Sequence, residues 1–306
     1  MEVSINRGAG VARFSAITGG AALVLSFAFG GQALAAITAS KHDLSPTGTG
    51  ANKFTATDVT QREICVFCHT PHGADSTASV PLWNRKLAAG TYTTYNTLGT
   101  SSLIGGVAKV GSVSIACLSC HDGATAMDVM INAPGSGGYN PAGAAWSLTG
   151  GSWTTGTGQL NGATITNIGA NLTNDHPVGI QYAGGPKTTA PTTGVYAAAN
   201  FRNPDFVPAY GAAINGSTVW WVDTAPGTAT VRDKTDMQLY SRNPTTDVGN
   251  GTDGSLIAAF GTVGVNANQP FVECASCHDP HGPAGTTQFL RLSNQGSAVC
   301  LACHVK

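Results

Sequence analysis

The apolar residues of this chain are concentrated in one run near its start, and elsewhere they are scattered among glycine, threonine and asparagine. The run covers residues 16–29, follows Arg7 and Arg13, and precedes the small-residue sequence Ala33-Leu34-Ala35. A basic start, an apolar middle and a small-residue cleavage site make up a secretory signal peptide. The run contains glycines and is shorter than the ~20 apolar residues of a spanning helix. We therefore predict a signal peptide over residues 1–35 and no membrane span in the mature chain.

Beyond this run, the alternation of apolar and polar residues is weak, and no segment has the sustained period of a long helix. Residues 133–252 are rich in glycine, threonine, asparagine and proline, which favours loops, turns and short strands. Ser217–Val222 is rich in β-branched and aromatic residues, and we predict a short strand there. We predict a short helix over residues 124–131. The pattern as a whole predicts a mostly irregular fold with few short helices and strands.

All eight cysteines belong to four copies of the sequence Cys-x-x-Cys-His. In this motif the two thiols add to the vinyl groups of a haem, and the histidine takes one axial position of its iron. Each copy therefore predicts one covalently attached haem c. The predicted attachment residues are Cys65, Cys68, Cys117, Cys120, Cys274, Cys277, Cys300 and Cys303, and the proximal ligands are His69, His121, His278 and His304.

Four further histidines stand outside the motifs: His42, His72, His176 and His281. Their number matches the four second axial positions, so we predict four bis-histidine irons with these residues as distal ligands. His72 and His281 each follow a motif histidine by three residues. Such a short step cannot pass around a porphyrin edge, so each should ligate a neighbouring haem and hold two rings close together. Unligated loop histidines are the alternative at His72, His176 and His281.

Other roles for the cysteines explain less of the pattern. Exported cysteines commonly form disulfides, and paired Cys-x-x-Cys units can bind zinc through four sulfurs. Neither alternative requires a histidine after the second cysteine of all four pairs. Met127 and Met130 are alternative axial ligands, although the histidine count already suffices, and we expect them to pack against a porphyrin face.

We divide the chain into four segments. After the signal peptide, residues 36–133 carry the first two haem sites, residues 134–255 form a Gly/Thr/Asn-rich region with His176, and residues 256–306 carry the last two sites. The first cysteines of that last pair are 26 positions apart, so their haems should be neighbours. Because little regular structure is signalled, we expect stacked haems to form the core and the haem-free chain to be largely unfolded.

Charge narrows the range of partners. Removal of residues 1–35 leaves 13 basic and 15 acidic residues, a formal net charge of −2. Nucleic-acid binding requires a basic face, and this composition provides none. Only 10% of all residues are charged, which is typical of a surface that is buried in an assembly or kept soluble by other means such as glycans.

The ligand-bearing segments resemble tetrahaem outer-surface cytochromes of metal-reducing microbes, of the OmcE type that polymerises into extracellular filaments. The resemblance rests on residues 63–73, the segment around His42, residues 117–123, residues 175–178 and the paired C-terminal sites. It implies a continuous haem stack along a homopolymer, with one axial histidine donated by the adjoining subunit. By this resemblance His42, near the N-terminus, is the first candidate for that role and His176 the second.

These observations predict an electron-transfer protein without a catalytic site, because bis-histidine iron has no open position for a substrate. Its expected partners are identical subunits, other cytochromes and extracellular electron acceptors, and its expected location is the cell surface. Two alternatives stay open. One is a monomeric periplasmic electron shuttle, and the other is a multihaem reductase in which one iron lacks a distal histidine.

Overall fold

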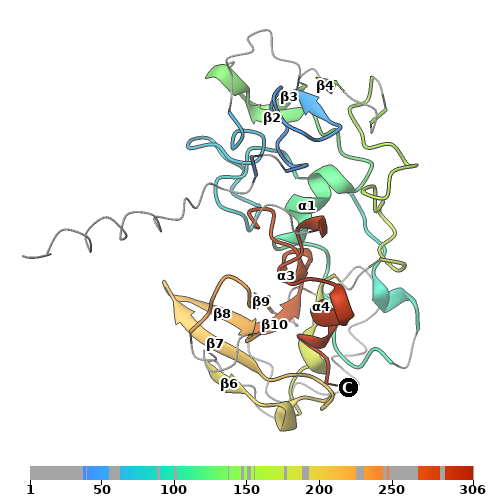
Figure 1. Ribbon diagram of the computed structural model, residues 1–306, viewed down its shortest axis with the longest axis vertical. Helices are drawn as coiled ribbons and strands as arrows, with labels where there is room; N and C mark the ends of the chain where they lie inside the picture. The colour runs from blue at the N-terminus through green and yellow to red at the C-terminus, as the bar shows by residue number, and fades with distance from the viewer. Residues whose placement is uncertain are drawn as a thin grey trace, which may run out of the picture. The chain divides into compact units, whose positions relative to one another are not determined.

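A computed structural model gives the arrangement of the chain (Figure 1). Residues 35–306 form one compact unit. The structure describes residues 37–38, 40–54, 63–87, 90–99, 102–136, 138–145, 148–149, 153–154, 156–175, 178–187, 193–224, 231–243, 247, 268–282 and 287–305. The predicted signal peptide and His176 lie outside these residues.

The largest element is a six-stranded antiparallel sheet with the order β5-β10-β9-β8-β7-β6. Most of its strands come from the Gly/Thr/Asn-rich region, and β10 comes from the segment just before the third cysteine motif. Its strands are β5 Ile180–Gln181, β6 Gly194–Tyr196, β7 Ala209–Ile214, β8 Ser217–Val222, β9 Met237–Arg242 and β10 Gln269–Val272. The strand predicted over Ser217–Val222 is therefore confirmed.

The hairpin between β7 and β8 has a local cause. Ile214 pairs with Ser217, which leaves Asn215 and Gly216 as a two-residue loop in which both residues have positive φ. Asn-Gly is the sequence that such a loop prefers, because both residues tolerate the left-handed region. Within the hairpin, Gly211 faces Trp220, and a Cβ on Gly211 would lie 2.5 Å from the indole ring. The glycine therefore makes room for the buried tryptophan.

A hydrophobic cluster forms from side chains of the sheet and of the turns beside it. Trp220 lies at its centre, is fully buried and donates a hydrogen bond from Nε1 to the carbonyl oxygen of Asn268 at 2.9 Å. The other buried members are Tyr182, Ala183, Tyr196, Phe201, Ala209, Val222, Met237 and Leu239. Burial of these apolar side chains stabilises the sheet region. The stacked-haem core therefore stays a prediction alongside an observed protein core.

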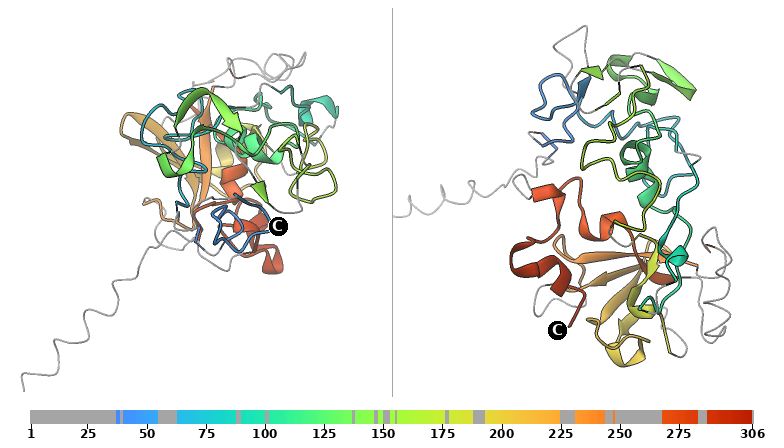
Figure 2. Two further views of the ribbon diagram at one scale, coloured as in Figure 1. Left: turned by 90° about the horizontal axis from the view of Figure 1, so that it is seen from above. Right: turned by 90° about the vertical axis from the view of Figure 1, so that its right-hand side faces the viewer.

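The remaining elements are short. Two small antiparallel sheets pair β1 Lys53–Phe54 with β4 Leu148–Thr149 and β2 Val129–Asn132 with β3 Tyr139–Ala145. The α-helices are α1 Ser114–His121, α3 Cys274–Cys277 and α4 Ala298–Leu301, and α3 packs against β9. The 3-10 turns are Tyr95–Thr97, Pro134–Ser136, Tyr182–Gly184, Ala198–Asn200, Thr287–Phe289 and Gln295–Ser297. Figure 2 shows α3 and α4 beside the six-stranded sheet. The predicted fold class of short elements separated by irregular chain is confirmed.

The helix predicted over residues 124–131 is wrong, because the second half of this segment forms strand β2. The preceding helix α1 ends at His121, and the Asp122 carboxylate accepts hydrogen bonds from the backbone of Ala124 and Thr125. Such side-chain bonds to the backbone compete with helix continuation. Met130 on β2 then packs with Leu44, Phe54 and Phe67 in a second buried cluster. Among the described residues, no helix has the length and apolar character to cross a membrane.

Candidate haem-binding sites

All four Cys-x-x-Cys-His copies form a single turn of helix. The backbone N–H of the histidine donates to the carbonyl of the first cysteine in three copies, at 2.8 Å for His69, 3.1 Å for His278 and 3.0 Å for His304. The second copy is the C-terminal half of α1. Residues three and four apart lie on one helix face. Each copy therefore presents both sulfurs and its imidazole to the same side, as attachment to one porphyrin requires.

Three of the motif histidines are held by backbone carbonyls. The Nδ1 atoms of His69, His121 and His278 lie 2.8 Å from the carbonyl oxygens of Pro81, Thr166 and Gln288, respectively. A carbonyl oxygen only accepts, so each Nδ1 carries the proton and donates. The lone pair is then on Nε2, and the ring orientation is fixed, as is usual for metal-ligating histidine.

Two pairs of histidine rings lie at the separation expected of two imidazoles that bind one iron. The ring centroids of His69 and His281 are 5.9 Å apart with planes inclined by 23°, and those of His42 and His121 are 6.2 Å apart and inclined by 58°. Two metal–nitrogen bonds of about 2 Å each, with half an imidazole ring at either end, give a centroid separation of about 6 Å. Each pair joins a motif histidine to a histidine outside the motifs.

His42 lies in an environment that favours metal binding. Its ring stacks on Phe289 at 4.2 Å with planes inclined by only 9°. Burial, together with the neighbouring imidazoles of His121, His281 and His278, lowers the pKa of His42 to about 4. The ring is therefore neutral at pH 7, which is the state that donates a lone pair to a metal.

The cysteines of successive copies are neighbours. In the haem-free chain, burial raises the pKa of Cys68 to about 12, and the nearby Cys120 of the second copy adds to this effect. Cys117 and Cys274 are within hydrogen-bonding reach of each other, which raises the pKa of the Cys117 thiol. Burial raises the pKa of Cys277, and the nearby Cys300 raises it further, so the third and fourth copies are also neighbours. The copies thus follow one another in space in their sequence order.

All eight cysteines are free thiols in this structure. Among the described residues, no group of three or more His, Cys, Asp or Glu side chains is arranged to hold a metal ion. The donor set fits haem c, because each helical turn supplies two sulfurs for thioether bonds and one imidazole for the iron. For the first two copies, His281 and His42 lie where they would supply the second imidazole to a bound haem.

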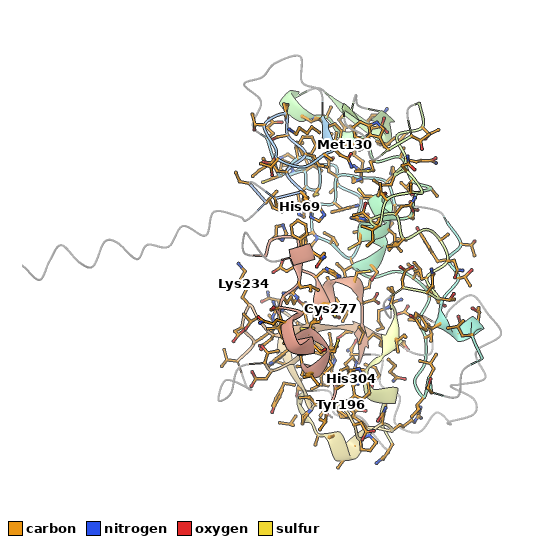
Figure 3. All side chains as sticks on the ribbon, turned by 45° about the vertical axis from the view of Figure 1, so that its right-hand side comes forward. His69, Met130, Tyr196, Lys234, Cys277 and His304 are labelled. Carbon is orange, nitrogen blue, oxygen red and sulfur yellow. The ribbon has the colours of Figure 1, made fainter. Side chains whose placement is uncertain are left out.

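The third and fourth copies lie against the six-stranded sheet. Cys277 and Cys303 both pack against the cluster around Trp220. The His304 ring lies 4.3 Å from the ring of Phe206, and Figure 3 shows Cys277 between His69 and His304. The C-terminal pair of sites therefore packs on the six-stranded sheet.

The predicted site residues are brought together to different extents. His42, His69, His121 and His281 form the two opposed pairs. The His72 side chain is exposed, and in the described part of the chain its imidazole is not paired with another histidine ring. His176 is outside the described residues, and the assignment of a distal ligand to each of the four irons stays a prediction.

Several residues around the sites could not be found from sequence patterns. Pro81, Thr166 and Gln288 act through backbone carbonyls, which any residue type provides. Phe289 belongs to an apolar run that resembles ordinary packing, and it has a positive φ of 58° together with 52° at Gln288. Left-handed backbone at non-glycine residues is uncommon and marks segments held by their surroundings. Here Phe289 stacks on the ring of His42, and the carbonyl of Gln288 accepts the hydrogen bond from His278 Nδ1.

Comparison with known proteins supports the haem assignment. A family model described as "Doubled CXXCH motif" matches residues 268–306, which contain the third and fourth copies. No curated protein matches the chain. The paired motifs indicate a haem-binding c-type cytochrome with covalently attached haem c, a class typical of electron transfer.

Proposed function

We propose that this chain is an exported tetrahaem cytochrome that conducts electrons through bis-histidine haems and polymerises into an extracellular filament. The observation that carries the proposal is the pair of imidazole gaps, 5.9 Å for His69 and His281 and 6.2 Å for His42 and His121. In each gap, a residue outside the motifs lies opposite a motif histidine from a distant part of the sequence. This arrangement would give two irons both of their axial ligands. His72 and His176 would then remain for the irons of His278 and His304.

The residues of the chain would bind and orient the haems, and the haem irons would carry out the electron transfer. Haem iron between two imidazoles supplies one-electron transfer without an open coordination position. The carbonyls of Pro81, Thr166 and Gln288 orient the proximal rings. His281 joins the third motif segment to the first haem site, so these two parts of the chain are tied together through one iron. Close attachment points shorten the path between haems, which favours rapid transfer.

The proposed filament contact involves His72. The resemblance to filament-forming cytochromes implies that one axial histidine comes from a neighbouring subunit. His42 was the first candidate from the sequence, but it lies opposite His121 of the same chain and so has an intramolecular iron to ligate. His72 is exposed and follows the first motif, where a neighbouring molecule can reach it. We therefore assign the intersubunit role to His72, with His176 as the second candidate.

Export and low surface charge support the extracellular part of the proposal. Thioether attachment takes place outside the cytoplasm, where a signal peptide over residues 1–35 would deliver the chain. A chain in which only 10% of all residues are charged suits burial between subunits better than a dispersed monomeric state.

Three measurements test the proposal on protein made in a host that matures c-type cytochromes. The intact mass and the haem content of purified protein should give four covalently bound haems per chain. Electron paramagnetic resonance should show low-spin ferric iron only, and negative-stain microscopy should show filaments. Zinc or disulfides in place of haem would refute the cytochrome, while discrete monomers under all conditions would favour the periplasmic shuttle. A high-spin signal in intact filaments would favour the reductase.

A further inference from the structure

A buried polar contact joins the two helices that carry the second and third haem attachments. The Ser114 hydroxyl, at the first residue of α1, donates to Glu273 Oε2 at 2.5 Å. The same hydroxyl oxygen accepts the backbone N–H of Cys274 at 3.0 Å. Ser114 and Glu273 are 0% and 1% exposed, so water does not compete for these bonds. One serine therefore links the start of α1 to the start of α3.

The Glu273 carboxylate also caps its own helix and carries a paired charge. Its backbone N–H and side chain form a capping box with Ser276 at the start of α3. Its Oε1 accepts a hydrogen bond from Arg242 Nη1 at 2.6 Å. Arg242 is itself 6% exposed and donates further bonds to Asp247 at 3.2 Å and to the carbonyl of Lys109 at 2.9 Å. The carboxylate is thus held by three partners: the Ser114 hydroxyl, the Arg242 guanidinium and the backbone N–H of Ser276.

The position of this carboxylate gives it a role beyond helix capping. Glu273 directly precedes Cys274, and Ser114 lies three residues before Cys117. The sulfurs of Cys117 and Cys274 are within hydrogen-bonding reach of each other. The Glu273 carboxylate, paired with Arg242, therefore lies at the junction of the second and third haem sites. A buried ion pair is weak evidence for a gain in stability, because desolvation offsets the attraction.

We propose that Glu273, held by Ser114 and Arg242, is a positioning residue that fixes the second haem against the third and lowers the reduction potentials of both. This inference rests on the proposed haem loading. Reduction adds an electron to each haem, so a nearby carboxylate in a medium of low dielectric disfavours it. Ser114 acts on the spacing between the two haems, and Glu273 acts on both the spacing and the potentials.

The first test replaces the charge and keeps the shape. Glu273→Gln keeps the size of the side chain and an oxygen that accepts from Arg242, and it removes the negative charge. Its amide N–H₂ can donate to Ser114 Oγ, which reverses the direction of that hydrogen bond. The haems attached at Cys117 and at Cys274 should become easier to reduce by about tenfold in their equilibrium constants, or about 59 mV for a one-electron couple. The haems at Cys65 and Cys300 should shift much less. Spectroelectrochemical titration of the fully loaded protein measures these values, and a His42→Ala variant identifies the signal of the second haem.

Asp247→Asn is the matched control. It removes the same charge from the same arginine, but Asp247 is 30% exposed and accepts its side-chain bonds from Arg242 and Asn243, neither of which is in a haem-bearing helix. Its effect on the potentials should be several times smaller than that of Glu273→Gln. Equal shifts in the two variants, or no shift in either, would overturn the role of Glu273.

Ser114→Ala tests the spacing independently and without a change of charge. It should alter the magnetic interaction between the second and third haems in paramagnetic resonance spectra and leave the haem content at the wild-type value. An unchanged interaction would overturn the bridging role even if Glu273→Gln failed to fold. Failure of the proposed function looks different, since wild-type protein would then lack haem at Cys117 or Cys274.

Discussion

Replacing His281 with alanine should open the sixth coordination position of one iron only. The His281 ring lies 5.9 Å from that of His69 and 23° from parallel, and its side chain is 55% exposed, so its removal leaves little cavity behind. The pair formed by His42 and His121 has its own gap of 6.2 Å and does not depend on His281. One of the four proposed haems, a quarter of the total, should therefore become five-coordinate.

Carbon monoxide binding measures this change directly. Reduced His281→Ala protein should bind one carbon monoxide per chain, and the oxidised variant should show one high-spin ferric signal. The first haem of wild-type protein should bind no carbon monoxide and stay low-spin. His72→Ala is the matched control, because it removes the equivalent trailing histidine of the first motif and should leave the iron of His69 six-coordinate. If His281→Ala kept its first haem low-spin, or if His72→Ala opened that haem, the interpretation of the opposed rings as an iron site would fail.

Further predictions concern assembly and the sheet. His72→Ala should abolish filaments in negative-stain microscopy. His42→Ala should preserve the filaments and leave one haem five-coordinate in paramagnetic resonance spectra. Loss of filaments in His42→Ala alone would reverse the assignment of the intersubunit ligand. Gly211→Ala should destabilise the fold by about 1–3 kcal/mol, because its new methyl group would overlap the Trp220 ring. Gly162→Ala, which meets no atom within 4 Å, is the control, and equal midpoints of denaturant unfolding would contradict the packing argument. Trp220→Ala should lower the free energy of unfolding by about 3–5 kcal/mol through loss of the buried indole. Denaturant unfolding of the variant and the wild-type protein measures this difference.

The haem chemistry was accessible from sequence because the motif is local. Two cysteines and a histidine within five consecutive residues need only one helical turn to face the same way, and every copy forms that turn. The short strand Ser217–Val222 was accessible for a similar reason, since its β-branched and aromatic residues act within one segment. The loop Asn215-Gly216 carried an equally local signal for the hairpin that joins it to β7.

The six-stranded sheet was harder to predict. Its strands are only two to six residues long, so most of them are too short to carry a strong pattern. Their stability comes from pairing and from the shared cluster around Trp220, which brings residues 182–239 into one core. The error at residues 124–131 has the same origin, because pairing of β2 with β3 and packing of Met130 outweighed the weak local preference for a helix.

The sequence by itself determined which residues can attach haem and how many imidazoles are present to ligate iron, because covalent attachment depends on neighbours along the chain. Only the tertiary structure decided that His281 lies opposite His69 and His42 opposite His121, since these residues are separated by 212 and 79 positions and meet only when the chain folds. It also decided that Ser114 and Glu273 share a hydrogen bond. Contacts between distant segments depend on the folding of everything between them, and no local pattern of residues encodes them.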